Sequence, residues 1–459
     1  MADAEAGLPR ATPSAASRSV PVPVPASEWS QGAAWGRDAV PGEDSPVAAP
    51  NVEPPVAEAV DGAPPANAEQ NGKGKGKGKE EKKKAEFWIS WDSLERRLNL
   101  GKWVALSCCT DHTLKIWDLQ SKECRGTLGG EGQHEASVRC VAMDRKALAA
   151  ITGADDGSLC YWDLERCRVQ ESNLSRKYGA MLCIDADFVA MRAITGTSEG
   201  TIVIWELPRL RALHVLPAHE GARVLSVHLD VGLGRVMSAA TDGRLRFWDL
   251  ETNKCVSTYE GHLDGITTSF VDFNRNRVVS GGEDGTLHLW HSEKNSIIYN
   301  LVGHSDKINA MQVNLDKGMV VSASEDETAR VWDIHSGSSL GVLEGHTRAV
   351  RDVQTDFERL VAITCSDDAT IRIWDLAGRT CTNVFESHAD RVSVIRVNWS
   401  KMQMISGSAD YTVKLWDLTT EFLEETFYGH GGPILTIAAP IPESKPPEKP
   451  EKTTKTSVS

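Results

Sequence analysis

The feature that most constrains this chain is a motif that recurs eight times between residues 103 and 440. Each copy ends on a tryptophan six residues after an acidic turn residue, as in EDGTLHLW and DDATIRIW. Successive tryptophans lie 45, 43 and 43 residues apart, and then 42 residues apart four times. A period of roughly 40–45 residues indicates repeated structural units that bury their hydrophobic faces against one another. The closing tryptophans are Trp117, Trp162, Trp205, Trp248, Trp290, Trp332, Trp374 and Trp416.

Each copy reads as four short β-strands. In the copy that ends at Trp290, the segments ITTSFVDF, RVVSGG, TLHLW and SIIYNLV are rich in β-branched and aromatic residues, which favour strands. An Asp-Gly turn between the second and third segments is a strong hairpin signal. Twisted four-stranded sheets pack face to face around an axis, which protects most of their edges. The sequence therefore predicts an all-β fold, an eight-bladed β-propeller of four-stranded antiparallel blades over residues 86–440.

The copies resemble the WD-repeat β-propeller family, because Trp-Asp ends the third strand in six of the eight. The exceptions are Trp205-Glu206 and Trp290-His291. The resemblance covers residues 103–440 and implies a buried tetrad of His, Ser or Thr, Asp and Trp in each blade. In such a tetrad the indole N–H donates to the hydroxyl, while the imidazole bridges the hydroxyl and the carboxylate. Every buried polar group then has a partner, which specifies one packing arrangement.

The resemblance places complete tetrads within six copies. The copy that ends at Trp205 departs from the pattern, because Glu199 replaces the aspartate and Lys177 or Tyr178 stands where the histidine belongs. That blade is expected to be looser, or Tyr178 to face a partner. The six sets are His134, Thr152, Asp156 and Trp162; His219, Ser238, Asp242 and Trp248; His262, Ser280, Asp284 and Trp290; His304, Ser322, Asp326 and Trp332; His346, Thr364, Asp368 and Trp374; and His388, Ser406, Asp410 and Trp416.

The first copy lacks a histidine, because the position 28 residues before Trp117 is Ile89. The segment GHGGPILTIAAP follows the eighth copy and has no unit of its own. We expect its His430 to complete a tetrad with Ser107, Asp111 and Trp117, and residues 433–439 to form the first strand of the first blade. Pairing the two ends of the propeller in this way removes an open sheet edge. An alternative uses residues 87–91 as that strand, but they supply no histidine.

The recurring His, Ser and Asp residues are the inventory of a hydrolase triad. Their presence in most copies favours a structural role, because one active site needs only one set. No nucleophile elbow, P-loop or histidine pair with metal-ligand spacing is present. The ten cysteines form no Cys-x-x-Cys pair and are expected to be buried reduced thiols. The sequence therefore predicts a non-catalytic protein without a metal, a cofactor or a small-molecule substrate.

The segments outside the repeats are predicted to be disordered. Residues 1–85 are rich in Pro, Ala, Glu and Gly and end in a Lys-Gly tract, and residues 441–459 are equally polar. The tract reads as a flexible linker, or else as a nuclear-import signal or an RNA tether. Residues 87–102 form either a short helix or a strand. With no long apolar run and no secretory signal, we expect a cytoplasmic or nuclear protein that does not bind membranes.

The predicted function is a protein-interaction scaffold or adaptor that presents one rigid propeller face to other proteins or peptides. Alternatives are the substrate-recognition subunit of a ubiquitin ligase, and an RNA- or ribosome-associated propeller. No closing tryptophan has Arg three residues later, so the Trp-Asp-x-Arg docking motif of ubiquitin-ligase propellers is absent. A net charge of −14 disfavours nucleic-acid binding outside the Lys-Gly tract. Candidate partner-binding residues on the face with the strand four-to-one and two-to-three loops are Arg223, Lys307, Arg348, Arg391, Glu283, Glu325 and Asp367.

Overall fold

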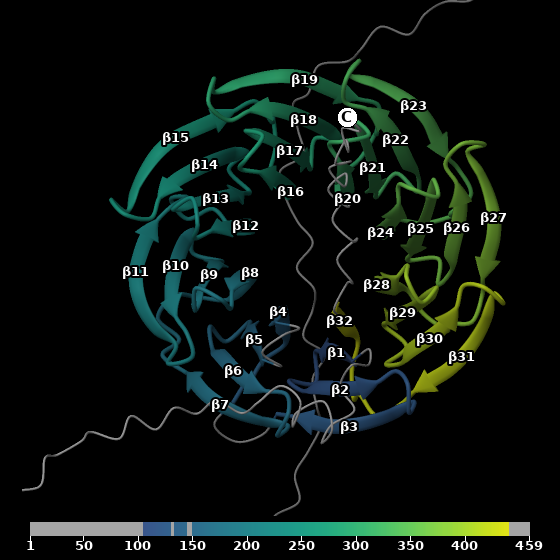
Figure 1. The fold of residues 1–459 in the computed structure, drawn as a ribbon, viewed down its shortest axis with the longest axis horizontal. Coiled ribbons are helices and arrows are strands. Elements are labelled where there is room, and N and C mark those ends of the chain that lie inside the picture. Colours follow the sequence, from purple (N-terminus) through teal and green to yellow (C-terminus); the bar gives the residue numbers. More distant parts are fainter. Residues whose placement is uncertain (1–103, 130–132, 145–148, 440–459) are drawn as a thin grey trace, which may run out of the picture. The chain divides into compact units, whose positions relative to one another are not determined.

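The computed structural model describes residues 104–129, 133–144 and 149–439, which form eight four-stranded antiparallel sheets arranged in a ring (Figure 1). This confirms the predicted eight-bladed propeller. The described residues contain strands and turns but no α-helix, and therefore none that could cross a membrane. The predicted disordered arm, the Lys-Gly tract, the ambiguous segment 87–102 and the C-terminal tail all lie outside the described residues.

Four strands that are consecutive in the chain form each blade except the first, which takes one strand from the C-terminal end of the repeats. The first blade contains β1 (Val104–Cys109), β2 (Leu114–Asp118), β3 (Glu123–Leu128) and β32 (Ile434–Ala438). The second, third and fourth blades contain β4 (Val138–Asp144), β5 (Ala149–Ala154), β6 (Leu159–Asp163) and β7 (Arg168–Asn173); β8 (Met181–Asp187), β9 (Arg192–Thr197), β10 (Thr201–Glu206) and β11 (Arg211–Pro217); and β12 (Val224–Asp230), β13 (Arg235–Ala240), β14 (Arg244–Asp249) and β15 (Lys254–Glu260).

The remaining four blades repeat the same plan. They contain β16 (Ile266–Asp272), β17 (Arg277–Gly282), β18 (Thr286–His291) and β19 (Ser296–Val302); β20 (Ile308–Asn314), β21 (Met319–Ser324), β22 (Ala329–Asp333) and β23 (Ser338–Leu343); β24 (Val350–Asp356), β25 (Val361–Ser366), β26 (Ile371–Asp375) and β27 (Thr380–Phe385); and β28 (Val392–Asn398), β29 (Gln403–Ser408), β30 (Val413–Asp417) and β31 (Phe422–Phe427).

The position of a strand within its blade decides how much of it is buried. In the β16–β19 blade, the second strand RVVSGG is buried along almost its whole length, because neighbouring blades cover both of its faces. The fourth strand SIIYNLV lies at the outer edge of the ring and exposes most of its residues (Figure 1). This gradient explains why the second strands consist mainly of apolar and small residues, whereas the fourth strands are mixed.

The core consists of eight hydrophobic clusters among the described residues, and each cluster lies between two adjacent blades. Each closing tryptophan packs against the preceding blade. Trp332 of β22, for example, shares a cluster with Val279 and Leu289 of the β16–β19 blade. Burying one large apolar side chain contributes roughly 1.5–3 kcal/mol. Blade-to-blade packing, repeated around the ring, is therefore the main source of stability.

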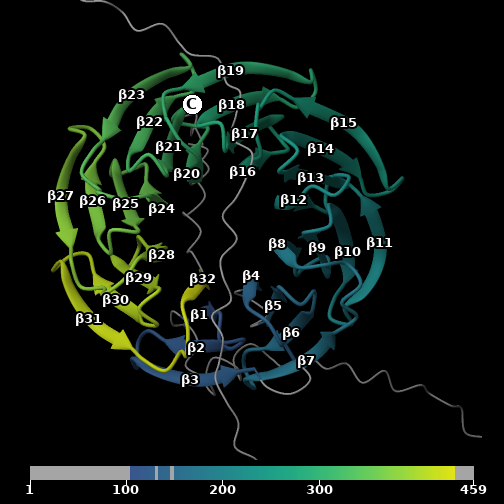
Figure 2. The same ribbon diagram turned by 180° about the vertical axis from the view of Figure 1, so that it is seen from behind.

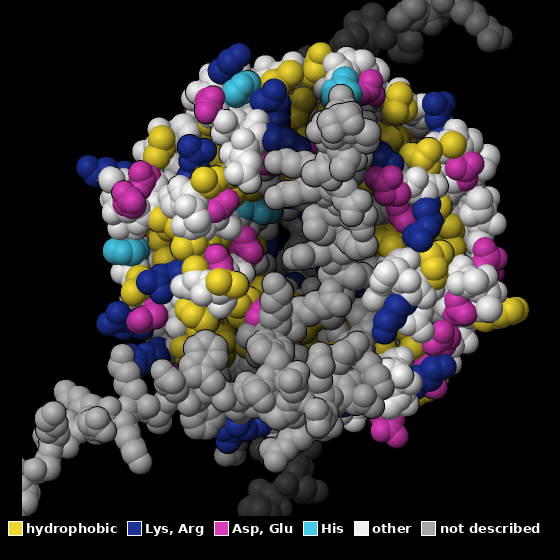
Figure 3. Space-filling view, in the orientation of Figure 1, with side chains coloured by type: hydrophobic (Ala, Val, Ile, Leu, Met, Phe, Trp, Pro, Cys, Tyr) yellow, Lys and Arg dark blue, Asp and Glu magenta, His cyan; other side chains and the backbone are white. Residues whose placement is uncertain are grey.

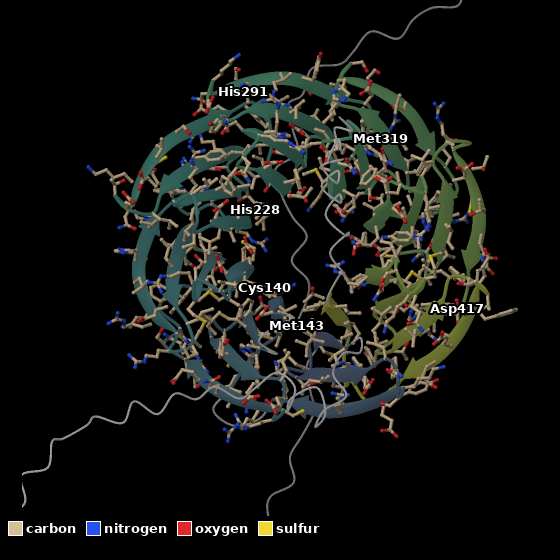
Figure 4. All side chains as sticks on the ribbon, in the orientation of Figure 1. Cys140, Met143, His228, His291, Met319 and Asp417 are labelled. Carbon is tan, nitrogen blue, oxygen red and sulfur yellow. The ribbon has the colours of Figure 1, made fainter. Side chains whose placement is uncertain are left out.

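Side chains at the inner edge of the ring also link neighbouring blades. His228 of β12 lies at this edge, and its Nε2 is 3.0 Å from the carbonyl oxygen of Ser269 in β16 (Figure 4). In β20, the amide of Asn309 donates to the carbonyl oxygen of Val350 in β24 at 2.9 Å. These contacts satisfy backbone carbonyls that the innermost strands would otherwise leave unpaired.

The first blade is completed from the two ends of the repeat region. β32 pairs antiparallel with β1, with Ser107 opposite Ile437 (Figure 2). Ile434 and Ile437 join the cluster between the last and first blades, where both are fully buried. The structure thus places the strand where the Gly-His segment after the eighth copy predicted it. Residues 87–91 lie outside the described residues.

Candidate functional site

The recurring tetrad residues meet inside each blade. In the β20–β23 blade, the indole N–H of Trp332 donates to Ser322 Oγ at 2.8 Å, and Ser322 Oγ lies 2.8 Å from His304 Nε2. His304 Nδ1 lies 2.8 Å from Asp326 Oδ2. The same three links occur in five other predicted sets, those of His219, His262, His346, His388 and His430.

A fifth side chain, a hydroxyl that the sequence reasoning missed, supports the tetrad aspartate in six blades. The exception is Asp242, which accepts a backbone N–H from Arg244 at this position. Thr328 donates to Asp326 Oδ1 through both its backbone N–H and its hydroxyl, at 3.0 and 2.7 Å. Burial alone would raise the pKa of Asp326, but hydrogen bonds from His304 and Thr328 outweigh it and hold that pKa well below its usual range. The signal is visible in the sequence as a hydroxyl four residues before the tryptophan, at Thr113, Ser158, Thr201, Thr286, Thr328, Thr370 and Thr412.

The β4–β7 blade departs from the expected tetrad. His134 Nε2 lies 2.7 Å from Thr152 Oγ1, which accepts the indole N–H of Trp162 at 2.7 Å. His134 Nδ1, however, contacts Ser158 Oγ at 2.6 Å instead of Asp156. Ser158 in turn donates to Asp156, so the carboxylate is reached through one additional hydroxyl. The direct contact predicted between His134 and Asp156 is thus replaced by a relay through Ser158.

The β8–β11 blade replaces the histidine with an aromatic ring. The indole of Trp205 still donates to Thr195 Oγ1 at 2.9 Å. Tyr178 packs edge-on against Trp205, with ring centroids 5.8 Å apart and an interplanar angle of 82°. Tyr178 is half-buried in the core cluster between this blade and the preceding one. The blade therefore closes with an apolar contact where the others use a polar network.

The buried networks are poorly placed for catalysis. The tetrad histidines expose less than a tenth of their surface, and each ring nitrogen that the network uses already has a partner. The glycine before His262 is also part of the packing, since a Cβ on Gly261 would lie 2.7 Å from Cη2 of Trp290. The histidines hold the loop between blades against the tryptophan, which is a structural role.

We call the face that carries the loops between blades and the second-to-third-strand turns the upper face. Several predicted residues on it form ion pairs between adjacent blades. Lys307 lies 3.1 Å from Glu283 of the preceding blade. Arg351 of β24 contacts both Glu325, at 3.2 Å, and Asp367. Arg351 was missed by the sequence reasoning. These pairs link the blades and neutralise three of the predicted acidic residues.

The other three predicted cations on the upper face are exposed. Arg223, Arg348 and Arg391 each stand in a loop that precedes a first strand. Their guanidinium groups form no ion pair with any described residue. On the face that Figure 3 shows, Lys and Arg side chains are interspersed with Asp and Glu. The three exposed arginines are available to a partner without first breaking an ion pair with a described residue.

Tyr411 is a second feature of the upper face that the sequence reasoning missed. It lies five residues before Trp416, at a turn position where four other blades have glycine, and its φ is +70°. Bulky residues rarely adopt this left-handed conformation. Tyr411 is 48% exposed, and Tyr428 at the upper end of β31 is 74% exposed. The turn that carries Tyr411 is joined to the loop of Arg391 by a backbone bond from Ala409 N–H to the Arg391 carbonyl oxygen.

The comparison with protein families agrees with the architecture. A model described as WD domain, G-beta repeat matches more than half of the chain, at residues 99–118, 122–163, 210–249, 253–291, 295–333, 337–375 and 379–417. The chain belongs to the WD40 repeat family. The matched ranges of this WD40 protein leave out residues 164–209, which include most of the blade in which Tyr178 replaces the histidine.

Individual relatives resemble only parts of the WD40 chain. Mitochondrial division protein 1 of Aspergillus clavatus is 41% identical over 63 residues, which cover 14% of this chain and 9% of that protein. Ribosome biogenesis protein YTM1 of Coprinopsis cinerea is 32% identical over 71 residues, which cover 15% of this chain and 16% of that protein. The matches thus span less than a fifth of either relative.

A larger part of this chain resembles a solved structure. The crystal structure of the computationally designed Ika8 protein gives a TM-score of 0.59 at 25% identity, covering 67% of this chain and 91% of that chain. This likeness concerns the propeller architecture. WD40 propellers typically bind other proteins and generally act as non-catalytic scaffolds, so the family directs attention to the surface of the ring.

Proposed function

We propose that this protein is a non-catalytic interaction scaffold that binds a partner protein through the upper face of the β24–β27 and β28–β31 blades. The observation that carries the proposal is Tyr411, a half-exposed aromatic residue in a turn conformation that favours glycine. Residues in strained conformations that persist on a surface often serve function, because the strain costs stability without improving packing.

The surface around Tyr411 has the composition of a binding site. Aromatic residues and arginine are the side chains that most often dominate the binding energy of protein interfaces. Tyr411, Tyr428 and Arg391 belong to one blade, and Arg348 stands in the corresponding loop of the neighbouring blade. This combination suits a partner segment that offers carboxylates to the arginines and apolar surface to the tyrosines.

The mechanism of such a scaffold is rigid presentation. The ion pairs of Arg351 with Glu325 and Asp367, and of Lys307 with Glu283, hold adjacent loops in fixed positions. The buried tetrads anchor the same loops from below through their histidines. A surface that is already ordered loses little conformational entropy on binding, so more of the contact energy contributes to affinity.

The same proposal places the protein in the cytoplasm or the nucleus. All ten cysteines are free thiols, and the strand thiols of Cys108 and Cys365 are fully buried. Reduced cysteines are the usual state in those compartments. A ubiquitin-ligase or ribosome-associated role would be a special case of the scaffold, distinguished by the partner that is captured and, for RNA, by steep salt dependence.

The test compares charge reversals on the two faces of the ring. The double variant Arg348→Glu/Arg391→Glu should lose proteins that the full-length chain captures by cross-linked pull-down. The control Lys294→Glu/Lys401→Glu makes the same change in net charge on exposed turns of the opposite face, and it should capture them normally. Both variants should melt like the parent, because none of the four side chains forms an ion pair with a described residue.

Two results would contradict the proposal. Identical capture profiles for the parent and the upper-face variant would remove these arginines from the binding surface. Equal losses in both double variants would show that capture depends on overall charge and not on the upper face.

A further inference from the structure

In one blade the residue two positions before the closing tryptophan contacts the tetrad carboxylate. In the β12–β15 blade, a guanidinium nitrogen of Arg246 lies 2.8 Å from Asp242 and also contacts Nδ1 of His219. A positive charge thus faces the buried His-Asp pair. Four further blades have a basic residue at the same position, which holds Lys115, Arg330, Arg372 and Lys414.

The β16–β19 blade has His288 at this position. The imidazole of His288 is 2% exposed and stacks on His262, with ring centroids 4.1 Å apart and an interplanar angle of 17°. Its Nδ1 is buried and has no hydrogen-bond partner among the described residues. An unpaired ring nitrogen in a buried position is costly unless a ligand satisfies it.

Three potential metal ligands converge in this blade. One ring nitrogen of His262, one of His288 and a carboxylate oxygen of Asp284 all lie within 4.8 Å of one another. We propose that these three residues bind a divalent transition-metal ion, for which Zn²⁺ is the best match. The ion would occupy the place that the Arg246 cation takes in the preceding blade.

The donor set explains the choice of metal. Two imidazoles and one carboxylate are a common zinc set, with a fourth position left to water, whereas Ca²⁺ and Mg²⁺ prefer oxygen ligands. Bonds of about 2.0–2.1 Å to one ion would require the donor atoms to change their present separations.

Metal binding at Nδ1 of His262 requires the ring proton to move to Nε2. At present the ring donates from Nδ1 to Asp284, and Nε2 lies 2.8 Å from Ser280 Oγ. A metal on Nδ1 requires the neutral tautomer with its proton on Nε2. Ser280 Oγ can then accept from His262 as well as from Trp290, because a hydroxyl oxygen has two lone pairs. The tautomer changes, and no net proton is released.

A second cluster in the ring shows why convergence alone is insufficient. Cys109, Asp111 and His430 also bring three donor atoms together in the first blade. There the Cys109 thiol donates to the carbonyl oxygen of Gly432 at 3.0 Å and accepts the backbone N–H of Asp111 at 3.4 Å. All three residues of that cluster are already engaged. In the β16–β19 blade His262 and Asp284 are engaged as well, but Nδ1 of His288 has no partner among the described residues. The β16–β19 blade is therefore the stronger candidate.

The test titrates the full-length, chelator-treated protein with zinc chloride by calorimetry and with cobalt chloride by visible absorption. His288→Lys and His288→Arg introduce residues that other blades carry at this position, so both variants should fold. The parent should bind one more equivalent of Zn²⁺ than either variant, and only the parent should show the absorption of tetrahedral Co²⁺. Zn²⁺ should also raise the melting temperature of the parent alone.

Each outcome either supports or overturns the proposed zinc site. Equal zinc stoichiometry in the parent and a folded His288 variant would overturn the proposal, as would a parent that binds no zinc. Binding of Mg²⁺ or Ca²⁺ with the affinity of Zn²⁺ would also overturn it, since that result would indicate an oxygen site elsewhere. Supporting data require the loss of one equivalent together with an unchanged circular dichroism spectrum.

Discussion

Ser107 and His430 are joined by a 2.6 Å hydrogen bond between their side chains, although 323 residues separate them along the chain. The bond belongs to the tetrad of the first blade, whose first strand comes from the C-terminal end of the repeats. A ring that closes in this way covers the inner edge of β1, which would otherwise be open to pairing with other chains. The two ends of the repeat region are therefore a single cooperative unit.

Truncation tests the closure. Ending the chain after Phe427 removes β32 and His430, and it exposes the cluster that buries Ile434 and Ile437. Each isoleucine contributes roughly 1.5–3 kcal/mol, against a typical total stability of about 5–15 kcal/mol. We expect an insoluble product or a large fall in melting temperature. Ending the chain after Ile441 keeps β32 and should leave the melting temperature unchanged; equal melting of both truncations would refute the closure.

The tetrads can be tested by removing one donor. Trp332→Phe leaves Ser322 without its indole N–H and opens a small void beside Val279. The free energy of unfolding should fall by about 1–4 kcal/mol, because a hydrogen bond and packing are both lost. Tyr428→Phe, at a 74% exposed residue, is the control and should cost nothing measurable in urea denaturation. Similar losses at both positions would argue against a special role for the tetrad.

The stability should depend on pH through buried histidines. Burial lowers the pKa of His134 from 6.5 to about 4, against the opposing charge of Asp156. As the pH falls, the unfolded chain binds a proton at this residue before the folded chain does. The stabilisation is complete above pH 6.5 and is lost as the pH falls towards 4, which amounts to roughly 3 kcal/mol for His134.

The matching variant is His134→Gln, which removes this titration. Its free energy of unfolding should vary less steeply with pH between 7 and 4 than that of the parent, when both are measured by urea denaturation. Every other residue is identical in the two proteins, so the difference in slope isolates His134. Parallel curves would show that the imidazole is not kept neutral by burial.

Tyr411→Gly separates function from stability. Glycine adopts the φ of +70° without steric cost, which offsets its larger loss of entropy on folding. We expect the free energy of unfolding to be unchanged or to rise by up to about 1 kcal/mol, while partner capture falls. Ala369→Gly makes the equivalent change in the adjacent blade, where φ is +65°, and should leave capture intact. A variant at Tyr411 that loses stability would indicate that the tyrosine serves packing instead.

Much of the candidate site could be predicted because its determinants are local and repeated. The distance from His304 to Trp332 is the same in four successive copies, so one motif places four tetrads. The relay through Ser158 was missed because His134, Asp156 and Trp162 match the motif, and nothing in the motif reveals which atom His134 Nδ1 contacts. Thr328 can be seen in the sequence, but threonine is common in strands, so its position alone does not indicate a hydrogen bond to Asp326.

By itself, the sequence determined the number of blades, the four strands in each and the ring closure through His430, because these follow from spacings that recur along the chain. Only the tertiary structure decided which charges are paired, which ring stacks on His262 and that Tyr411 is strained. Arg351 meets Glu325 of the preceding blade, and His288 meets a loop that precedes its own first strand. Such contacts depend on side-chain directions across an interface, and the periodicity of the sequence does not encode them.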